Sequence, residues 1–115
     1  MELGKIPPND VEAEQAVLGC MLLDKDSVAL AFEILKPEDF YREENKLIFS
    51  AMLNLYSRSE PIDLITVKEE LVSLGKFEIC GGLEYIPDLP EKVPTTANAD
   101  KYITIVEEKS ILRNL

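Results

Sequence analysis

Apolar residues recur at spacings of three and four along most of this chain, and this period constrains its fold more than any other feature. The pattern is clearest between residues 43 and 56, where the apolar positions are Leu47, Ile48, Ala51, Met52, Leu55 and Tyr56. Such spacing places the apolar side chains on one face of an α-helix. No run of alternating apolar and polar residues, internal repeat or low-complexity tract competes with it. The sequence therefore predicts an all-α fold.

Capping residues mark where the predicted helices begin. Asn9, with Glu12 three residues later, forms a variant of the capping box before the first helix. Asp63 is expected to cap a later helix, and Thr95 or Thr96 the last one. The first helix is apolar around most of its circumference, so we expect it to be central and buried on more than one side. The predicted helices cover residues 11–23, 27–35, 43–56, 64–74 and 97–115.

Proline and glycine mark where the predicted helices end. Pro37 stops the second helix, because its ring would clash with the preceding turn. Gly75 occupies the C′ position at the end of the fourth helix. Pro87 and Pro90 prevent a regular helix of any length around residues 83–86, where we expect one or two broken turns. The sequence thus predicts about five to six helical segments.

Length and charge limit the classes of function that this chain can have. A length of 115 residues fits one domain. The 22 acidic and 12 basic residues give a net charge of -10, which repels phosphate backbones and anionic lipid surfaces. Because histidine is absent, catalytic triads, Cys–His nucleophile pairs and histidine metal sites are excluded. We expect no enzyme activity, no independent binding of nucleic acid and no membrane partner.

The two cysteines favour a reduced, cytoplasmic protein. Cys20 lies among apolar helix neighbours, and Cys80 lies beside a glycine pair. A disulfide between them is the alternative, and two buried or half-buried thiols are the preferred interpretation. The chain does not open with a signal-peptide pattern, and no apolar run approaches the ~18 residues of a membrane span. We therefore expect a soluble, cytoplasmic chain.

Two patterns that could bind ligands have simpler interpretations. Gly75-Lys76 lacks the first glycine and the hydroxyl residue of a phosphate-binding loop, so Gly75 is interpreted as a helix end. Four carboxylate pairs could hold Mg²⁺, which would make the chain a small acid-dependent enzyme. Nothing supplies a convergent pocket or a partner base, so solvated helix faces are preferred. The pairs are Glu38-Asp39, Glu43-Glu44, Glu69-Glu70 and Glu107-Glu108.

Two exposed features point to protein partners. Tyr85 follows a glycine pair in a segment that prolines keep irregular, so its ring is either a partly exposed partner contact or ordinary core filling. The last helix carries a second apolar face, on a different side from the face expected to pack on the core. We expect this second face to be an interface, in preference to a frayed helix end. Its residues are Ile105, Ile111, Leu112 and Leu115.

A series of short blocks spans nearly the whole chain. The blocks are Pro7-Pro8 with EAEQAVLG at 12–19, EDFY at 38–41, IF at 48–49, PIDLITV at 61–67, Gly81-Gly82 with Tyr85, PTTAN at 94–98, and Tyr102 with IVEEK at 105–109. In this order and spacing they resemble the N-terminal domain of the DnaB family of bacterial replicative DNA helicases. The family often has histidine where this chain has Asn45.

The resemblance implies a helical head over residues 1–94, followed over residues 95–115 by the first helix of a truncated helical hairpin. In the family, heads and hairpins of six subunits build the N-terminal collar of a ring, as dimers and a trimer of dimers. The second apolar face of the last helix would then be a subunit interface. The ATPase domain, which binds ATP and Mg²⁺ and unwinds DNA 5′–3′, is absent from this chain, so the resemblance implies no helicase activity and no cofactor here.

The resemblance also implies partners. In the family, the collar recruits the C-terminal domain of primase and works with a helicase loader at the replication fork in the bacterial cytoplasm. Glu12 and Tyr85 match head positions near the primase-facing surface. The resemblance implies contact with DNA only through the full-length ring. The alternative is a free-standing helical adaptor that binds another protein and never belonged to a helicase. The downstream gene sequence separates the two, because a phosphate-binding loop beyond Leu115 supports the helicase.

Overall fold

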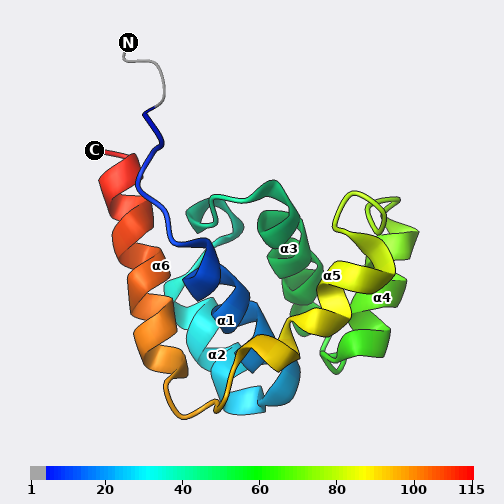
Figure 1. Ribbon diagram of the computed structural model, residues 1–115. Helices are drawn as coiled ribbons and strands as arrows, with labels where there is room; N and C mark the ends of the chain where they lie inside the picture. The colour runs from blue at the N-terminus through cyan, green and yellow to red at the C-terminus, as the bar shows by residue number, and fades with distance from the viewer. Residues whose placement is uncertain (1–4) are drawn as a thin grey trace.

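The computed structural model describes residues 5–115, and every regular element within this range is helical. The all-α prediction is confirmed. Two short 3₁₀ turns, η1 and η2, separate longer helices (Figure 1). The elements are α1 (Val11–Leu23), α2 (Lys25–Ile34), η1 (Pro37–Asp39), α3 (Glu43–Ser57), α4 (Leu64–Ser73), α5 (Gly82–Asp88), η2 (Pro90–Lys92) and α6 (Ala99–Arg113).

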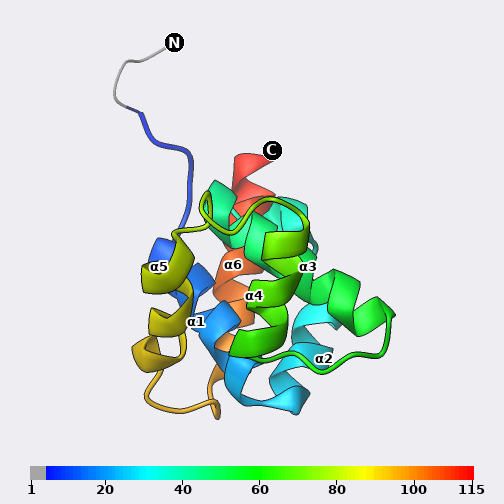
Figure 2. The same cartoon turned by 90° about the vertical axis from the view of Figure 1, so that its right-hand side faces the viewer.

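Helix α1 is the centre of the fold. It packs against α2, α3, α6 and η2, and eight of its residues between Ala13 and Met21 are buried. Burial on several sides explains why its sequence is apolar around most of the circumference, as predicted. The helices form successive layers in which α6 lies on one side of α1 and α2, while α3 and then α4 lie on the other (Figure 1). The perpendicular view in Figure 2 shows α4 and α5 covering this other side.

The observed N-terminal capping residue agrees with the sequence prediction at α4 and differs from it at α1 and α6. As predicted, Asp63 caps α4: its carboxylate accepts a hydrogen bond from the backbone N–H of Thr66. In turn, the hydroxyl of Thr66 accepts a hydrogen bond from the backbone N–H of Asp63. At α1 the prediction of Asn9 was wrong, because Asp10 accepts the N–H of Ala13 at 3.0 Å. Asn9 instead donates from its amide to the carbonyl of Pro7 at 2.9 Å. The two residues are adjacent, and the course of the proline lead-in decides which of them reaches the helix.

The start of α6 also corrects a prediction. Neither Thr95 nor Thr96 caps it; the N-cap position is Asn98, whose side chain makes no capping bond. The hydroxyl of Thr95 accepts the N–H of Ala97 at 3.1 Å and so stabilises the turn before the helix. Threonine side chains form such turns as readily as they cap helices, which is why the sequence could not separate the two roles.

Helix ends are set by glycine and proline. Gly75 adopts φ +70 after α4, which confirms it as a helix end. The expected broken turns are α5 and η2, but α5 runs through Pro87 for seven residues before the break. Pro87 leaves the carbonyl of Leu83 without its intrahelical donor. Leu83 is 71% exposed, so water can take the donor's place.

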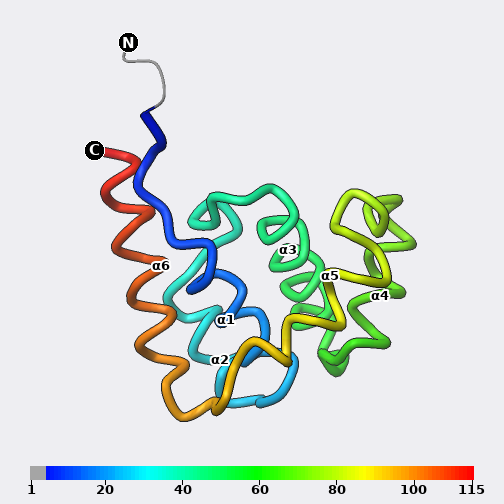
Figure 3. Tube along the Cα trace, viewed as in Figure 1, coloured from blue at the N-terminus to red at the C-terminus, as the bar shows by residue number. Residues whose placement is uncertain are grey.

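The end of α6 is fixed to the N-terminal segment and to η1. Arg113 donates from Nη1 to the carbonyl of Pro8 at 2.9 Å and from Nη2 to the carbonyl of Asp39 at 2.7 Å. Ser110 adds a bond to the Asp39 carboxylate at 2.7 Å. Figure 3 shows the N-terminal segment running beside this last part of α6. These contacts bring the two ends of the described chain together.

Cys20 and Cys80 are both buried and free, as predicted for reduced thiols. Burial raises the pKa of each thiol to about 11, and for Cys20 the charge of Asp24 adds to the effect. A thiol with such a pKa carries very little thiolate at neutral pH and is unreactive. Within residues 5–115, no helix combines the length and apolar content that crossing a membrane requires.

Candidate functional site

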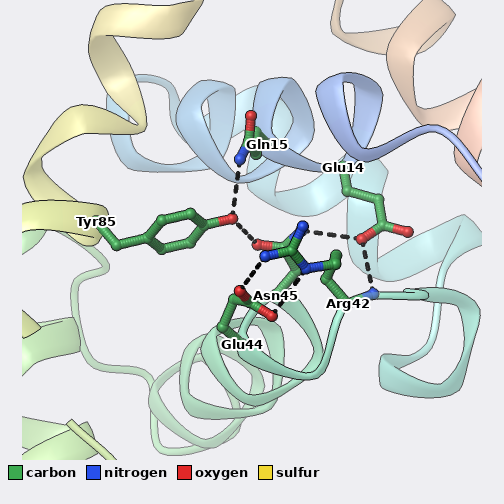
Figure 4. Close-up of polar contacts among 6 residues, drawn as sticks. All are labelled: Glu14, Gln15, Arg42, Glu44, Asn45 and Tyr85. Carbon is green, nitrogen blue, oxygen red and sulfur yellow. Dashed lines mark hydrogen bonds and ion pairs between the residues drawn. The ribbon is translucent and has the colours of Figure 1, made fainter. Parts of the chain in front are cut away.

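A buried carboxylate ties the start of α3 to α1. Glu14 is 1% exposed and accepts three hydrogen bonds. One comes from the backbone N–H of Tyr41 at 2.6 Å. The other two, from the backbone N–H of Arg42 at 3.3 Å and the amide of Asn45 at 2.9 Å, are drawn in Figure 4. A buried carboxylate needs such donors, because burying an unpaired charge is costly. Glu14 thus fixes the entry into α3.

Tyr85 joins a third helix to the same network. Its hydroxyl donates to the side-chain oxygen of Asn45 at 2.5 Å and accepts from the amide of Gln15 at 3.1 Å (Figure 4). The ring is half-buried and packs against the core. Burial raises the pKa of the Tyr85 phenol above its usual value, so the hydroxyl keeps its proton at neutral pH. The network connects α1, α3 and α5.

An ion pair lies beside this network on the surface. Arg42 contacts Glu44 with both Nε and Nη2, at 3.2 and 2.7 Å. The hydrogen bond from Arg42 lowers the pKa of Glu44, and the same bond raises the pKa of Arg42. Every buried polar side-chain atom of the described residues has a hydrogen-bond partner. The network is therefore saturated with hydrogen bonds inside the described chain, which holds α1, α3 and α5 together.

The network contains residues that the sequence did not single out as functional. Glu14 sits among buried positions of α1, and Gln15 and Asn45 give no local signal that they face Tyr85. A glutamate on the apolar side of a helix was the one available hint of a buried acceptor. Within residues 5–115, no group of three or more carboxylate and cysteine side chains is placed so that it could hold a metal ion.

Gln15 lies near both predicted primase-contact residues, because it donates to the Tyr85 hydroxyl and lines the same hollow as Glu12. Glu12 is exposed in the first turn of α1, where its charge favours the helix N-terminus. Tyr85 is half-buried and uses its hydroxyl for internal hydrogen bonds. Glu12 also lines a hollow of about 420 Å³ between the start of α1 and α6, together with Tyr102 and Ile105.

The four predicted interface residues of α6 fall into two groups. Ile111, Leu112 and Leu115 are 56%, 48% and 94% exposed, which is unusual for large apolar side chains so close together. Ile105 is half-buried and packs against the main core. The buried side of α6 faces the opposite way and consists of Ala99, Ile103, Val106 and Ser110. The structure therefore leaves an apolar surface on the last turns of α6.

Replacing Tyr85 with phenylalanine tests the role of the network. The change keeps the ring but removes the hydroxyl, which leaves Asn45 without its donor. We expect the free energy of unfolding to fall by about 1.5 kcal/mol, as for a lost buried hydrogen bond. Urea denaturation measures this, and Tyr41→Phe is the matched control, because the Tyr41 hydroxyl makes no hydrogen bond within the described chain. Equal stability of Tyr85→Phe and the unmodified chain would show that the hydroxyl is not part of the structural network.

Comparison with known proteins gives consistent matches. The family model described as the DnaB-like helicase N terminal domain matches residues 6–108. The replicative DNA helicase DnaB of Geobacillus stearothermophilus is 51% identical over 111 residues, which are 96% of this chain and 24% of that protein. The replicative DNA helicase DnaC of Bacillus subtilis is 50% identical over the same shares. The chain thus spans about a quarter of the length of these relatives.

Solved structures show the same fold. The N-terminal domain of DnaB helicase from Mycobacterium tuberculosis superimposes with a TM-score of 0.92 at 48% identity, covering 96% of this chain and 79% of that one. The N-terminal domain of DnaB helicase from Helicobacter pylori, which was studied with its interactions with primase, superimposes with a TM-score of 0.76. That pair is 23% identical and covers 90% of this chain and 80% of the other, so it supports the fold alone.

Proposed function

Because this chain belongs to the DnaB-like helicase N-terminal domain family, we propose that it acts as the assembly and docking domain of a hexameric replicative helicase. The family favours this function over a free-standing adaptor. The relatives are about four times as long as this chain. In our proposal the remainder of such a protein binds ATP and Mg²⁺ and unwinds DNA 5′–3′ during chromosome replication in the bacterial cytoplasm.

Assembly is supported by the apolar surface at the end of α6. We propose that residues 1–94 form the head and residues 95–115 begin the hairpin through which subunits meet as dimers, then as a trimer of dimers. Ile111, Leu112 and Leu115 are the exposed contacts, with Ile105 at the border of the surface. Packing them against a second subunit removes apolar area from water, which drives association. This exposed surface is the observation that carries the assembly function.

Docking is supported by the surface around α1 and α5. The H. pylori domain was studied with its interactions with primase, and we propose that this chain likewise docks the C-terminal domain of primase through Glu12 and Tyr85, with a helicase loader as a further partner. Several heads in one ring would offer repeated sites and raise the effective concentration of primase. The net charge of -10 opposes contact with DNA, so DNA would be gripped elsewhere in the full-length ring.

Self-association tests the assembly function. At roughly 50 μM, light scattering behind size exclusion is expected to give the mass of a dimer or a larger species. Replacing both Ile111 and Leu112 with aspartate should yield a monomer, because two charges would be buried in an apolar contact. The double variant should keep its helical circular dichroism, since both positions are exposed in the single chain. Ile65→Asp is the matched control, because Ile65 is also an exposed apolar residue, at 75%, and its helix α4 is remote from α6 (Figure 1). A monomeric unmodified chain at this concentration contradicts a self-sufficient interface.

A further inference from the structure

The side of α6 that faces the rest of the chain changes character near the end of the helix. Ala99, Ile103 and Val106 are buried apolar residues, and the same side continues with Ser110, which is buried, and Arg113, which is half-buried. These positions recur at spacings of three and four, so they lie on one face of the helix. The earlier turns of α6 are thus held by apolar packing, whereas the last turn depends on polar contacts.

Arg113 makes these contacts with two segments that are far apart in the sequence. Its Nη1 donates to the carbonyl of Pro8 at 2.9 Å, and its Nη2 donates to the carbonyl of Asp39 at 2.7 Å. The guanidinium also lies over the ring of Tyr41, 5.5 Å from the ring centroid. Hydrogen bonds from a charged donor are stronger than neutral ones, and the planar guanidinium directs its N–H groups in fixed directions. Arg113 therefore anchors the end of α6 to the N-terminal segment and to η1.

Ser110 makes a second contact about one turn earlier in α6. Its hydroxyl donates to Oδ1 of Asp39 at 2.7 Å. The other carboxylate oxygen, Oδ2, accepts the backbone N–H of Lys36 at 2.7 Å, which holds the carboxylate at the start of η1. Two contacts about one turn apart fix both the position of the last turn and its rotation about the helix axis.

The anchored residues alternate with exposed apolar residues of α6. Ile111 and Leu112 lie between Ser110 and Arg113 in the sequence and are 56% and 48% exposed. Anchoring Ser110 and Arg113 therefore also fixes the directions in which Ile111 and Leu112 point. We propose that Arg113 is a positioning residue for self-association, which holds the last turn of α6 in the orientation that a second copy of this chain contacts. A surface that is ordered in advance loses less conformational freedom on association.

Hydrogen exchange measured by NMR tests the anchor, at a concentration where light scattering shows a monomer. We expect the backbone amides of residues 110–114 to exchange about tenfold faster in Arg113→Gln, because the last turn loses its ties to the rest of the chain. Arg58→Gln is the matched control, since the Arg58 guanidinium also makes surface contacts, with Glu60 and Glu70, but at the end of α3. This control should leave exchange in residues 110–114 unchanged.

Sedimentation equilibrium then tests the role in association, and this part of the inference rests on the proposed assembly function. We expect Arg113→Gln to weaken self-association about tenfold, as when the competent orientation is populated only about a tenth of the time. Arg113→Lys should weaken it to a similar degree, because one ammonium does not reproduce the two directed bonds. Arg58→Gln should associate like the unmodified chain. Circular dichroism of each variant checks that the helices are retained.

The outcomes separate the anchor from the assembly function. Unchanged exchange of residues 110–114 in Arg113→Gln would overturn the anchor. Faster exchange with unchanged self-association would overturn the positioning role and leave the assembly function intact. Tight association of Arg113→Lys would mean that charge alone is sufficient and would contradict the two-bond geometry. If the unmodified chain is monomeric at every concentration, the proposed assembly function fails and the role of Arg113 in association fails with it, whereas the exchange data still decide whether Arg113 anchors α6.

Discussion

Replacing Glu14 with alanine is expected to lower the free energy of unfolding by about 4 kcal/mol, the largest effect that we expect from a polar residue. The change removes the acceptor of three hydrogen bonds, from the N–H groups of Tyr41 and Arg42 and from the Asn45 amide. Each buried donor left without an acceptor costs roughly 1 to 3 kcal/mol, and entry of water recovers part of this. The melting temperature should fall by roughly 15 °C.

The matched control lies two residues earlier in the same helix. Glu12→Ala removes a glutamate that is exposed and unpaired within the described chain, and it should change stability by less than about 0.5 kcal/mol. The loss in free energy of unfolding for Glu14→Gln should lie between those of Glu12→Ala and Glu14→Ala, because glutamine keeps one acceptor oxygen. Urea denaturation of the three variants gives the comparison. A Glu14→Ala variant that loses no more stability than Glu12→Ala would mean that the carboxylate does not hold α3 against α1.

Replacing Gly19 with alanine is expected to cost about 3 kcal/mol. Gly19 lies where α1 meets the start of η2, and an added Cβ would stand 2.4 Å from the carbonyl oxygen of Leu89. That oxygen belongs to the backbone, so a side-chain rotation cannot relieve the overlap. The helix and the turn must separate, which loosens the packing between them. The loss is therefore larger than the modest gain in helix propensity from alanine.

Gly75→Ala is the matched control for a glycine substitution. No heavy atom lies within 4 Å of the Cβ that it would add, but its φ of +70 is strained for alanine, so we expect a loss of about 1 kcal/mol. Hydrogen exchange distinguishes the mechanisms, because Gly19→Ala should speed exchange around η2 and Gly75→Ala should not. A Gly19→Ala variant as stable as the unmodified chain would contradict the close approach of α1 and Leu89.

The local parts of the fold could be predicted from the sequence because short-range chemistry determines them. The spacing of three and four over residues 43–56 predicts a helix, and the structure has α3 there, from Glu43 to Ser57. Asp63 caps α4 because its partner lies only three residues away. Choices between neighbouring candidates could not be made in this way. Asn9 and Asp10 are equally good caps by residue type, and the path of the preceding chain selects Asp10.

The candidate site could be predicted only in part, because its contacts join distant segments. Glu12 and Glu14 are alike in sequence, and only the packing of α3 makes one of them a buried acceptor. Tyr85 is 40 residues from Asn45 and 70 from Gln15, so no local pattern reveals its hydrogen bonds. The apolar residues of α6 were identified by their spacing, yet only the structure shows that Ile105 packs against the core.

Docking of primase is the function that we propose for the surface around α1 and α5, and calorimetric titration of the primase C-terminal domain into this chain measures it. We expect saturable binding with a Kd of roughly 1 to 10 μM, in the range of a transient interface. Absence of binding at roughly 200 μM, with both proteins folded by circular dichroism, would contradict it.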